Sequence, residues 1–374
     1  MNKFVKKIIA ILILCAMFLH LSACAQTEDK AKSVSATVIE IEKYGHAVLD
    51  ISVEDFMAYG YELGDVVSVS FDSYKEDIPF YDGYYSNPGT AMICGSDAKA
   101  NIALCINYGD FSVEKGLKIG DTVEISLTEK GGMLEIQKLC SLKYSNNRAD
   151  YSDDVTFANF RAVTIGRIGE GKLYRSASPI NNQHGRAGYA DDFIASVKVA
   201  TVLNLADSKE DIEEYLKSED FDSEYYLSLY KSGKVIAIDL TGNFVSKEFS
   251  DSIVEGLTFL AHNEAPYSIH CTEGKDRAGF TAMLLGALMG ASLEEIIDDY
   301  MVSFYNYYGI DKKTEPARYE IVLNNNLIVM MYHVMNVDTY EELKQVDLES
   351  AVTKYLIDAG MDKNDILTLK AKLG

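Results

Sequence analysis

Hydrophobic and polar residues follow two different patterns along the chain, and the pattern changes near residue 155. Residues 35–143 alternate short β-like runs with turns, and Gly64-Asp65 and Gly120-Asp121 each precede a run that contains valine. Short strands at this spacing predict a small all-β barrel or sandwich. We expect its strands to include 35–41, 66–71, 103–108, 122–127 and 133–137.

Residues 155–374 instead alternate apolar, strand-like runs with helix-like segments. Buried strands are predicted at 199–205, 234–240 and 266–270, and a helix at 208–216 follows the first of them. This order predicts an α/β domain with a central sheet flanked by helices. The C-terminal 60 residues are mostly helical in pattern and are expected to pack on its flank.

Local signals mark where several helices begin and where the two regions meet. Ser246 is expected to cap a helix whose apolar residues keep a helical period, and a second apolar helix is predicted at 279–289. Ser292 and Glu295 form a capping box for the helix after it. The polar segment 144–154 is predicted to link the β-rich region to the α/β region.

The first 23 residues have the pattern of a bacterial secretion signal. Three lysines precede an apolar run at 8–19, which is too short to span a membrane. Leu21-Ser22-Ala23-Cys24 resembles a lipobox, so cleavage there would leave a lipid-modified Cys24 and a tether at 24–34. This predicts a lipoprotein anchored on the extracytoplasmic face of a bacterial cell membrane. The alternative is an ordinary signal peptide in which Cys24 carries no lipid.

Composition narrows the set of partners. The chain has 374 residues, of which 48% are hydrophobic, and this is enough for two domains. Its net charge of −22 argues against nucleic acid as a partner. A phosphate-bearing substrate is compatible with this charge, because screening at physiological salt acts over about 8 Å and nearby cations dominate.

The cysteines of the first domain, Cys94, Cys105 and Cys140, have no predicted chemistry. A Cys94–Cys105 disulfide and three buried free thiols are both consistent with the sequence. The chain has neither a Cys-x2-Cys pair nor a cluster of histidines, so we expect no metal and no other cofactor.

The most informative stretch is 270–279, His-Cys-Thr-Glu-Gly-Lys-Asp-Arg-Ala-Gly, between a predicted strand and a predicted helix. In such an arrangement the loop N–H groups converge and the helix N-terminus adds positive potential, which makes an anion site. A helix N-terminus and a neighbouring His⁺ lower the pKa of a thiol, so Cys271 is expected to be a nucleophilic thiolate. Arg277 can hold two oxygens of a bound phosphate in a bidentate fork.

This stretch resembles the phosphate loop of the cysteine-dependent protein tyrosine phosphatase superfamily. The residues that carry the resemblance are His270, Cys271, Gly274, Arg277 and Gly279. Gly-Lys-Asp-Arg at 274–277 is similar to bacterial tyrosine phosphatases that also act on phosphoinositides, and 173–178 and 298–301 resemble further segments of that group. The resemblance covers roughly 155–310. It implies a phosphatase-like central sheet flanked by helices, and hydrolysis through a phosphocysteine intermediate.

The resemblance implies a role for each residue of the loop. Cys271 would be the nucleophile, and Arg277 would bind phosphate and stabilise the transition state. His270 and Arg175 would support the loop, although simple packing and a structural salt bridge are the alternative roles of these two. The phosphate would contact Thr272, Glu273, Gly274, Lys275, Ala278 and Gly279.

One position departs from the family pattern, which usually has Thr or Ser after the loop arginine. This chain has Ala278 there. The missing hydroxyl would have donated a hydrogen bond to the thiolate, a contribution of roughly 1.5–3 kcal/mol, or about one to two powers of ten in rate. We therefore expect slow hydrolysis of the phosphocysteine, not an inactive protein.

Two aspartates are candidates for the general acid that protonates the leaving oxygen. Asp276 precedes the loop arginine, as in some related phosphatases, and is slightly favoured. Asp239 ends a predicted strand 32 residues before Cys271, a separation similar to that of the acid loop in dual-specificity phosphatases. A turn or strand-end cap is the alternative role of Asp239.

Charge in the loop bears on the substrate. Lys275 adds a second cation, which favours substrates with several phosphates or an acidic headgroup, whereas Glu273 opposes this unless it faces out of the loop. The leading prediction is a phosphomonoester hydrolase acting on phosphotyrosine in a phosphoprotein, on a phosphoinositide, or on another phosphorylated small molecule. A phytase-like inositol polyphosphate phosphatase and a non-catalytic phosphate-binding pseudophosphatase, which Ala278 favours, are the alternatives.

Overall fold

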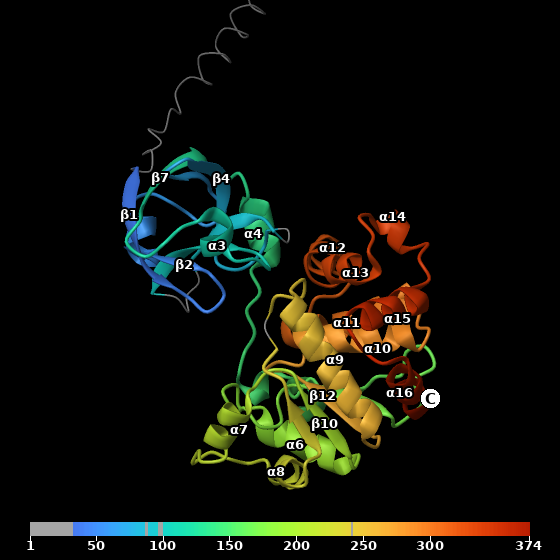
Figure 1. Cartoon of the computed structure of the whole chain (residues 1–374). Coiled ribbons are helices and arrows are strands. Elements are labelled where there is room, and N and C mark those ends of the chain that lie inside the picture. Colours follow the sequence, from blue (N-terminus) through green and yellow to red (C-terminus); the bar gives the residue numbers. More distant parts are fainter. Residues whose placement is uncertain (1–32, 87–88, 96–99, 241) are drawn as a thin grey trace, which may run out of the picture.

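The structure is a computed structural model and describes residues 33–86, 89–95, 100–240 and 242–374. The predicted signal segment and Cys24 therefore lie outside the described residues. Within the described part of the chain, an N-terminal β-barrel precedes an α/β domain (Figure 1). No helix in this part is both long and apolar enough to cross a membrane.

The N-terminal domain is a closed barrel of seven strands in the order β1-β2-β6-β5-β4-β3-β7. All neighbouring pairs are antiparallel except β4 and β5. Its strands are β1 (Val34–Ile41), β2 (Ala47–Ser52), β3 (Val66–Phe71), β4 (Tyr74–Tyr81), β5 (Ala91–Cys94), β6 (Asn101–Ile106) and β7 (Thr122–Glu129). Two short helices, α2 (Val53–Ala58) and α3 (Phe111–Lys115), lie between strands. The predicted all-β region is thus a barrel and not a sandwich.

Alternation along the strands builds the barrel core. In β3, Val67, Val69 and Phe71 are buried, and the residues between them are partly exposed. At one end of the barrel the rings of Phe56 and Tyr61 stack with their centroids 4.1 Å apart. Cys94, Cys105 and Cys140 are buried and are not in disulfides, so the expected alternative of a Cys94–Cys105 disulfide is not found.

The strand expected at 133–137 is wrong. This segment begins helix α4 (Leu134–Cys140), in which Gln137 and Cys140 are the buried residues. A spacing of three between buried positions is helical, and Lys138 pairs with Glu135 one turn earlier, Nζ to Oε1 3.7 Å. Five residues are too few for alternation to distinguish a strand from a helix, so packing against the next domain decides.

The α/β domain has a five-stranded sheet in the order β11-β10-β12-β9-β8. The four strands from β11 to β9 are parallel, and β8 is antiparallel to β9. The strands are β8 (Arg161–Ala162), β9 (Leu173–Ser176), β10 (Thr201–Asn204), β11 (Val235–Ala237) and β12 (Tyr267–His270). The predicted strands at 199–205, 234–240 and 266–270 are confirmed, and β12 occupies the centre of the sheet.

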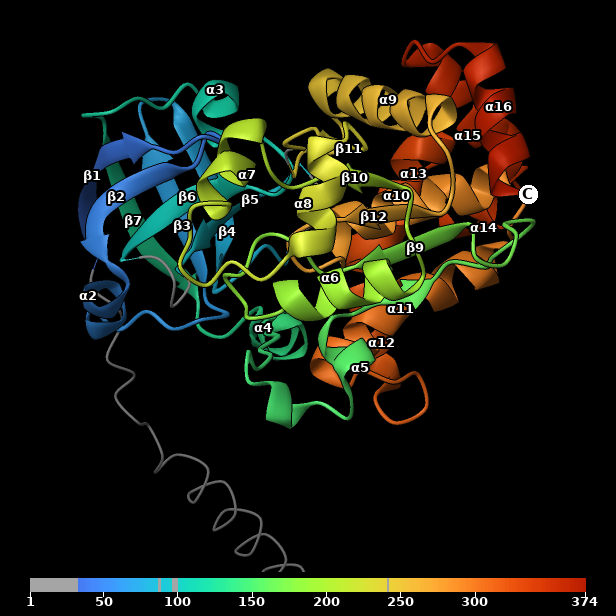
Figure 2. The same cartoon turned by 90° about the horizontal axis from the view of Figure 1, so that it is seen from below.

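Helices cover both faces of this sheet (Figure 2). One face packs against α6 (Ala187–Ser196), α7 (Lys209–Tyr215) and α8 (Glu224–Lys231). The short helix α5 (Asp154–Phe157) contacts α6 and α11. The other face carries α9 (Lys247–His262), α10 (Asp276–Leu288) and α11 (Leu293–Tyr308). The C-terminal helices extend this second layer: α12 (Pro316–Leu323), the π-helix η2 (Asn324–Ile328), α13 (Val329–Met335), α14 (Tyr340–Leu343), α15 (Leu348–Asp358) and α16 (Lys363–Leu373).

The predicted helix starts are confirmed by their hydrogen bonds. The hydroxyl of Ser246 accepts from the N–H of Phe249 at the start of α9, and Ser292 and Glu295 form the capping box of α11. These caps fix where the two helices begin.

The barrel docks on the α/β domain through α4 and the chain that follows it (Figure 1). Arg318 of α12 donates hydrogen bonds to the carbonyl oxygens of Leu139 and Ser141, at 3.0 Å and 2.9 Å. After α4 the chain passes a 3-10 turn, η1 (Arg148–Asp150), before it enters the α/β domain. The docked barrel therefore lies beside the edge of the sheet where the strands end.

Candidate active site

The stretch 270–279 forms the end of the central strand β12, a loop and the start of α10. Cys271 is the first residue after β12 and is 3% exposed. Carboxyl ends of parallel strands are where α/β domains bind ligands. The N-terminus of α10, which begins at Asp276, is directed into this position and adds positive potential.

Two positions in or next to the loop require glycine, because neighbouring atoms lie too close to leave room for a side chain. Gly274 has φ +68°, and a Cβ at this residue would lie 2.1 Å from the carbonyl oxygen of Ser176. A Cβ on Gly279 would lie 2.5 Å from the ring of Tyr300. Any side chain at these two positions would push the loop or the start of α10 out of place.

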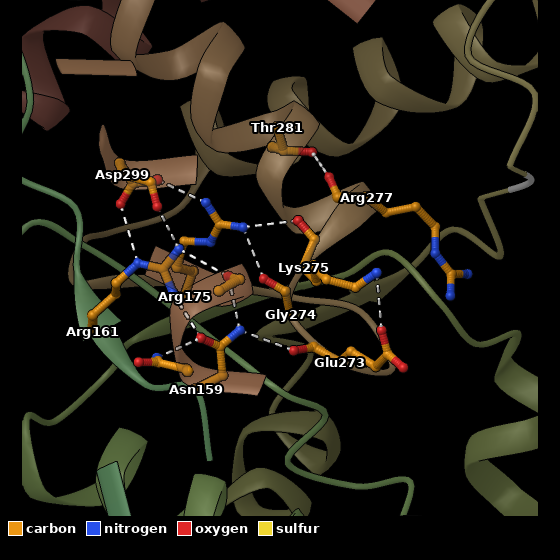
Figure 3. Close-up of polar contacts among 11 residues, drawn as sticks. Asn159, Arg161, Arg175, Glu273, Gly274, Lys275, Arg277, Thr281 and Asp299 are labelled. Atoms are coloured by element: carbon orange, nitrogen blue, oxygen red, sulfur yellow. Dashed lines mark hydrogen bonds and ion pairs between the residues drawn. The ribbon is translucent and has the colours of Figure 1, made fainter. Parts of the chain in front are cut away.

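Buried side chains hold the loop from behind. Arg175, which is fully buried, donates from one guanidinium nitrogen to the carbonyl oxygens of Gly274 and Lys275 at 2.8 Å and 3.0 Å (Figure 3). Its other terminal nitrogen pairs with Asp299 at 2.7 Å. Asn159 donates to the carbonyl oxygen of Glu273 at 3.0 Å. The loop carbonyls are thus bound on the side away from solvent.

A second arginine completes this arrangement. Arg161 lies opposite Arg175 in the β8–β9 pair and contacts the other carboxylate oxygen of Asp299 at 3.2 Å. Burial alone would raise the pKa of Asp299, but Arg161 and Arg175 hold it below its usual range. Burial lowers the pKa of Arg161 to about 10, so it stays charged at neutral pH. We call Asn159, Arg161, Arg175 and Asp299 the support network.

Lys275 lies between two carboxylates. Its ammonium is 3.5 Å from Glu273 and 3.1 Å from Asp276, and it lies over the ring of Phe304 at 5.1 Å. Burial alone would lower the pKa of Lys275, but Asp276 and Glu273 raise it well above its usual value. Glu273 also accepts a hydrogen bond from the hydroxyl of Tyr144. The negative charges of Glu273 and Asp276 therefore offset the positive charge of Lys275.

Arg277 extends to the opposite side of the loop from Arg175 (Figure 3). Its guanidinium donates to the carbonyl oxygen of Leu240 at 3.2 Å and to the hydroxyl of Thr272 at 3.1 Å. Among the described residues, no carboxylate lies within ion-pair distance of Arg277. Its charge is therefore free to bind an anion, which is what a phosphate clamp requires.

Arg277, Asp276 and Lys275 line a cleft with a volume of about 490 Å³ between the two domains. Phe244, Asn325 and Asn326 line the same side. The facing wall comes from the barrel and the end of α4, namely Tyr44, Tyr84, Tyr85, Asn107, Tyr108 and Cys140. A substrate that reaches Arg277 through this cleft therefore contacts both domains.

A family model described as the tyrosine phosphatase family matches residues 157–374, which cover the sheet, the loop and all helices after it. The chain belongs to the tyrosine phosphatase family. It is a cysteine-dependent phosphatase, and the resemblance first found in 270–279 is confirmed. The match begins after the barrel, which lies outside the region shared with the family.

Solved structures show weaker similarity to this phosphatase. The catalytic core of the PP-IP phosphatase Siw14 from S. cerevisiae, in complex with citrate, is 19% identical, with 44% of this chain and 94% of that chain covered and a TM-score of 0.26. An uncharacterized conserved protein from Thermotoga maritima is 21% identical, with 25% of this chain and 36% of that one covered and a TM-score of 0.24. No curated protein is similar enough to count as a match. Because these TM-scores are low, the family assignment depends on the match over 157–374 alone.

His270 of the phosphatase is buried and uncharged. Burial lowers the pKa of its imidazole to about 3, and neither ring nitrogen has a hydrogen-bond partner among the described residues. The structure therefore provides no His⁺ beside Cys271, contrary to the expectation from the sequence. The positive potential at the thiol comes from the N-terminus of α10 and from Arg277.

The two candidate general acids are placed differently. Asp276 lines the cleft next to Arg277, and its side chain is 51% exposed. Asp239 has φ +38° and pairs with Lys43 of the barrel at 3.4 Å, and it is not part of the cleft lining. The cleft thus brings Asp276 near a bound substrate, while the contact with Lys43 connects Asp239 to the docked barrel.

A third carboxylate near the loop was missed by the sequence reasoning. Asp207 is 3% exposed and accepts hydrogen bonds from Asn204 and Tyr215 at 3.0 Å and 3.2 Å. Burial raises the pKa of Asp207, while these hydrogen bonds and Arg277 lower it. Asn159, Arg161 and Asp207 are each far from 270–279 in sequence, and only the pairing of the strands reveals them.

Proposed function

We propose that this phosphatase hydrolyses phosphate monoesters through a phosphocysteine on Cys271. The thiolate sulfur attacks phosphorus, the ester P–O bond breaks, and Asp276 gives a proton to the leaving oxygen. Water then attacks phosphorus and gives a proton to the Asp276 carboxylate, the S–P bond breaks, and inorganic phosphate leaves with the Cys271 thiolate and the Asp276 carboxylic acid restored. The observation that carries the proposal is Arg277, a charged guanidinium on the Cys271 loop without a carboxylate partner among the described residues.

The charges of the loop favour a substrate with few phosphate groups over one with many. Before substrate binds, Lys275 and Arg277 carry two positive charges, and Glu273 and Asp276 carry two negative ones, so the four side chains sum to zero. Asp276 must take up a proton before it can act as the general acid. An inositol polyphosphate needs several unpaired cations, and among the described residues that line the cleft, Arg277 is the one without a carboxylate partner. We therefore propose a phosphotyrosine or phosphoinositide monoester as substrate, in preference to phytate.

The proposed location follows from the lipobox-like sequence at 21–24. A lipid on Cys24 would place the phosphatase on the extracytoplasmic face of a bacterial membrane, where its substrates would be external or periplasmic. Labelling of expressing cells with a fatty-acid analogue should mark the wild-type protein and leave Cys24→Ser unlabelled. Equal labelling of both proteins would refute the anchor without affecting the proposed chemistry.

The chemistry is tested with purified protein and an aryl phosphate in the presence of a chelator. Wild type should release phosphate, and Cys271→Ser should release none above background. Cys94→Ser makes the same substitution at a buried cysteine in the barrel and should keep the wild-type rate. Activity that survives in Cys271→Ser, or that requires added metal, would contradict the mechanism.

Ala278 favours a second candidate, a phosphate-binding protein that does not turn over. It is fully buried in α10, and the nearest hydroxyl on the same helix, Thr281, donates to the carbonyl oxygen of Arg277 at 3.0 Å. That hydroxyl is engaged with the backbone and does not replace the missing one. Tight binding of inorganic phosphate without release of aryl product would favour this candidate over the phosphatase.

A further inference from the structure

The segment that links the two domains contacts the phosphate loop at Glu273. Tyr144 lies in this segment, between α4 and η1, and its hydroxyl donates a hydrogen bond to the Glu273 carboxylate. Burial and the neighbouring Glu273 raise the pKa of the Tyr144 hydroxyl, so this group keeps its proton and remains a donor at neutral pH. The match to the family begins only at residue 157. The contact therefore comes from this chain's own linker and not from the region shared with the family.

Aromatic contacts hold the ring of Tyr144 in place. Its centroid lies 4.9 Å from that of Tyr307 and 5.7 Å from that of Tyr308, and both of these tyrosines belong to α11. The guanidinium of Arg186 lies 5.2 Å from the centroid of the Tyr144 ring, which is a cation–π distance. The direction of the Tyr144 hydroxyl is therefore set by packing.

Arg186 also holds the backbone of the linker next to Tyr144. It is buried, and its guanidinium donates to the carbonyl oxygen of Ser145 at 3.0 Å and to the side-chain oxygen of Asn146 at 2.9 Å. A third hydrogen bond, of 2.9 Å, goes to the hydroxyl of Tyr151. A buried guanidinium that lost these acceptors would be costly, so the linker is stabilised in its position beside the loop.

Glu273 is held at its backbone and at its carboxylate. Its carbonyl oxygen accepts a hydrogen bond of 2.6 Å from the hydroxyl of Tyr307, and its carboxylate lies between Tyr144 and Lys275 (Figure 3). Burial raises the pKa of Glu273, but Lys275 and the Tyr144 hydroxyl lower it, so Glu273 is charged at neutral pH. The described residues that line the cleft include Lys275 and Arg277 but not Glu273. The carboxylate is thus kept out of the cleft.

A carboxylate released from this position would oppose phosphate binding. Glu273 directly follows Thr272, whose hydroxyl accepts a hydrogen bond of 3.1 Å from Arg277. Charges interact over about 8 Å at physiological salt, so a Glu273 carboxylate turned toward Arg277 would repel phosphate and compete with it for the guanidinium. We infer that Tyr144 is a positioning residue of the phosphate site, and that its hydroxyl keeps the Glu273 carboxylate away from Arg277. The inference rests on the proposed function, because it takes Arg277 as the group that binds phosphate.

Binding of inorganic phosphate to the full-length protein tests this without any need for turnover. Tyr144→Phe keeps the ring and loses only the hydroxyl, and calorimetric titration should show that it binds phosphate about tenfold more weakly than wild type. In a Glu273→Gln background the same substitution should change the affinity by less than about twofold, because no charge is left to restrain. Tyr151→Phe is the matched control, since the Tyr151 hydroxyl bonds to Ser145 and Arg186 of the same cluster. It should bind phosphate within about twofold of wild type.

Phosphate binding by Tyr144→Phe that equals or exceeds that of wild type would overturn the inference. Equal weakening with and without the Glu273 carboxylate would also overturn it, because the hydroxyl would then act through the fold and not through Glu273. Phosphate binding that depends on Tyr144 in a protein whose wild type does not hydrolyse an aryl phosphate would refute the proposed hydrolysis and leave the inference standing. Hydrolysis by wild type, with a phosphate affinity that Tyr144→Phe leaves unchanged, would do the reverse.

Discussion

Arg175 and Arg277 lie on opposite sides of the same phosphate loop and have opposite surroundings (Figure 3). Arg175 is fully buried, is paired with Asp299 and donates to two loop carbonyls. Arg277 lines the cleft and donates only to neutral oxygens, those of Leu240 and Thr272. One guanidinium is committed to the loop itself, and the other remains available to a ligand.

This difference explains how the loop can bind an anion. The carbonyl oxygens of residues 273–275 accept hydrogen bonds from buried side chains, namely Asn159, Tyr307 and Arg175. Because N–H and C=O point in opposite directions across a trans peptide, N–H groups of these peptides are left to face the cleft. The support network should therefore determine stability, and the cleft side should determine activity.

The largest expected effect comes from Asp299→Asn. This substitution leaves Arg161 and Arg175 buried without their shared carboxylate. Breaking a buried ion pair in this way costs about 3–5 kcal/mol, which urea unfolding should measure, together with a loss of activity. Asp298→Asn changes the exposed neighbour and should stay within about 0.5 kcal/mol of wild type. Equal stability of the two variants would show that the support network does not stabilise the loop.

Arg→Lys at each side of the loop separates stability from activity. Arg277→Lys should lower kcat/KM by about two to three powers of ten with little change in Tm, because Lys cannot form the bidentate clamp. Arg175→Lys should instead lower the unfolding free energy by about 2–3 kcal/mol, because the buried carbonyl oxygens of Gly274 and Lys275 lose the hydrogen bonds that Arg175 donates. Similar effects of both variants on the same quantity would contradict the comparison.

The next effect is on the pH dependence of stability. The pKa of His270 is about 3 in the folded protein and 6.5 in a free side chain, so between these values only the unfolded state binds the proton. Stability is therefore complete above pH 6.5 and falls with decreasing pH, by about 2 kcal/mol between pH 6.5 and 5. Urea unfolding of wild type and His270→Asn across this range should show a flatter profile for the variant.

Asp191 provides a control of opposite sign. Burial raises the pKa of Asp191 to about 6, although hydrogen bonds from two backbone N–H groups lower it. Between pH 3.8 and 6 the folded state then binds the extra proton, so stability falls as pH rises through this window. Asp191→Asn should make the acid loss steeper, while His270→Asn makes it shallower. Parallel profiles for both variants would refute the assignment.

The smallest effect concerns Ala278. Ala278→Ser restores a hydroxyl next to the loop arginine, and we expect the hydrolysis of the phosphocysteine to become about tenfold faster. Stopped-flow measurement of the burst and the steady state separates the two chemical steps. Ala282→Ser, at another fully buried position of α10, should leave both rates unchanged. A faster first step with an unaltered second step would contradict this role.

Much of the site could be predicted from local sequence. The loop at 270–279, its strand and its helix are contiguous, so the pattern of residues was enough to identify them. The barrel strands and the helix caps could also be predicted, because each depends on a short stretch of sequence. The helix α4 was missed because its short alternating stretch is ambiguous, and docking on α12 selects the helix.

The remaining parts depend on contacts between distant residues. Arg161 and Arg175 are neighbours only through the pairing of β8 with β9, and Asp299 joins them from α11. Glu273 and Asp276 can offset the positive charge of Lys275 only because the loop curves and brings the three side chains together, and composition does not reveal this curvature. The facing wall of the cleft requires the barrel to dock, so no single segment predicts it.

The most direct test of the account is to trap the intermediate. Wild-type protein is mixed with an aryl phosphate, quenched in acid within the burst, and digested for mass spectrometry. The account predicts one added phosphoryl group on the peptide that contains Cys271, and none after the same treatment of Cys271→Ser. Stoichiometric release of the aryl product with Cys271 unmodified at every quench time, or a phosphoryl group on a different residue, would contradict it.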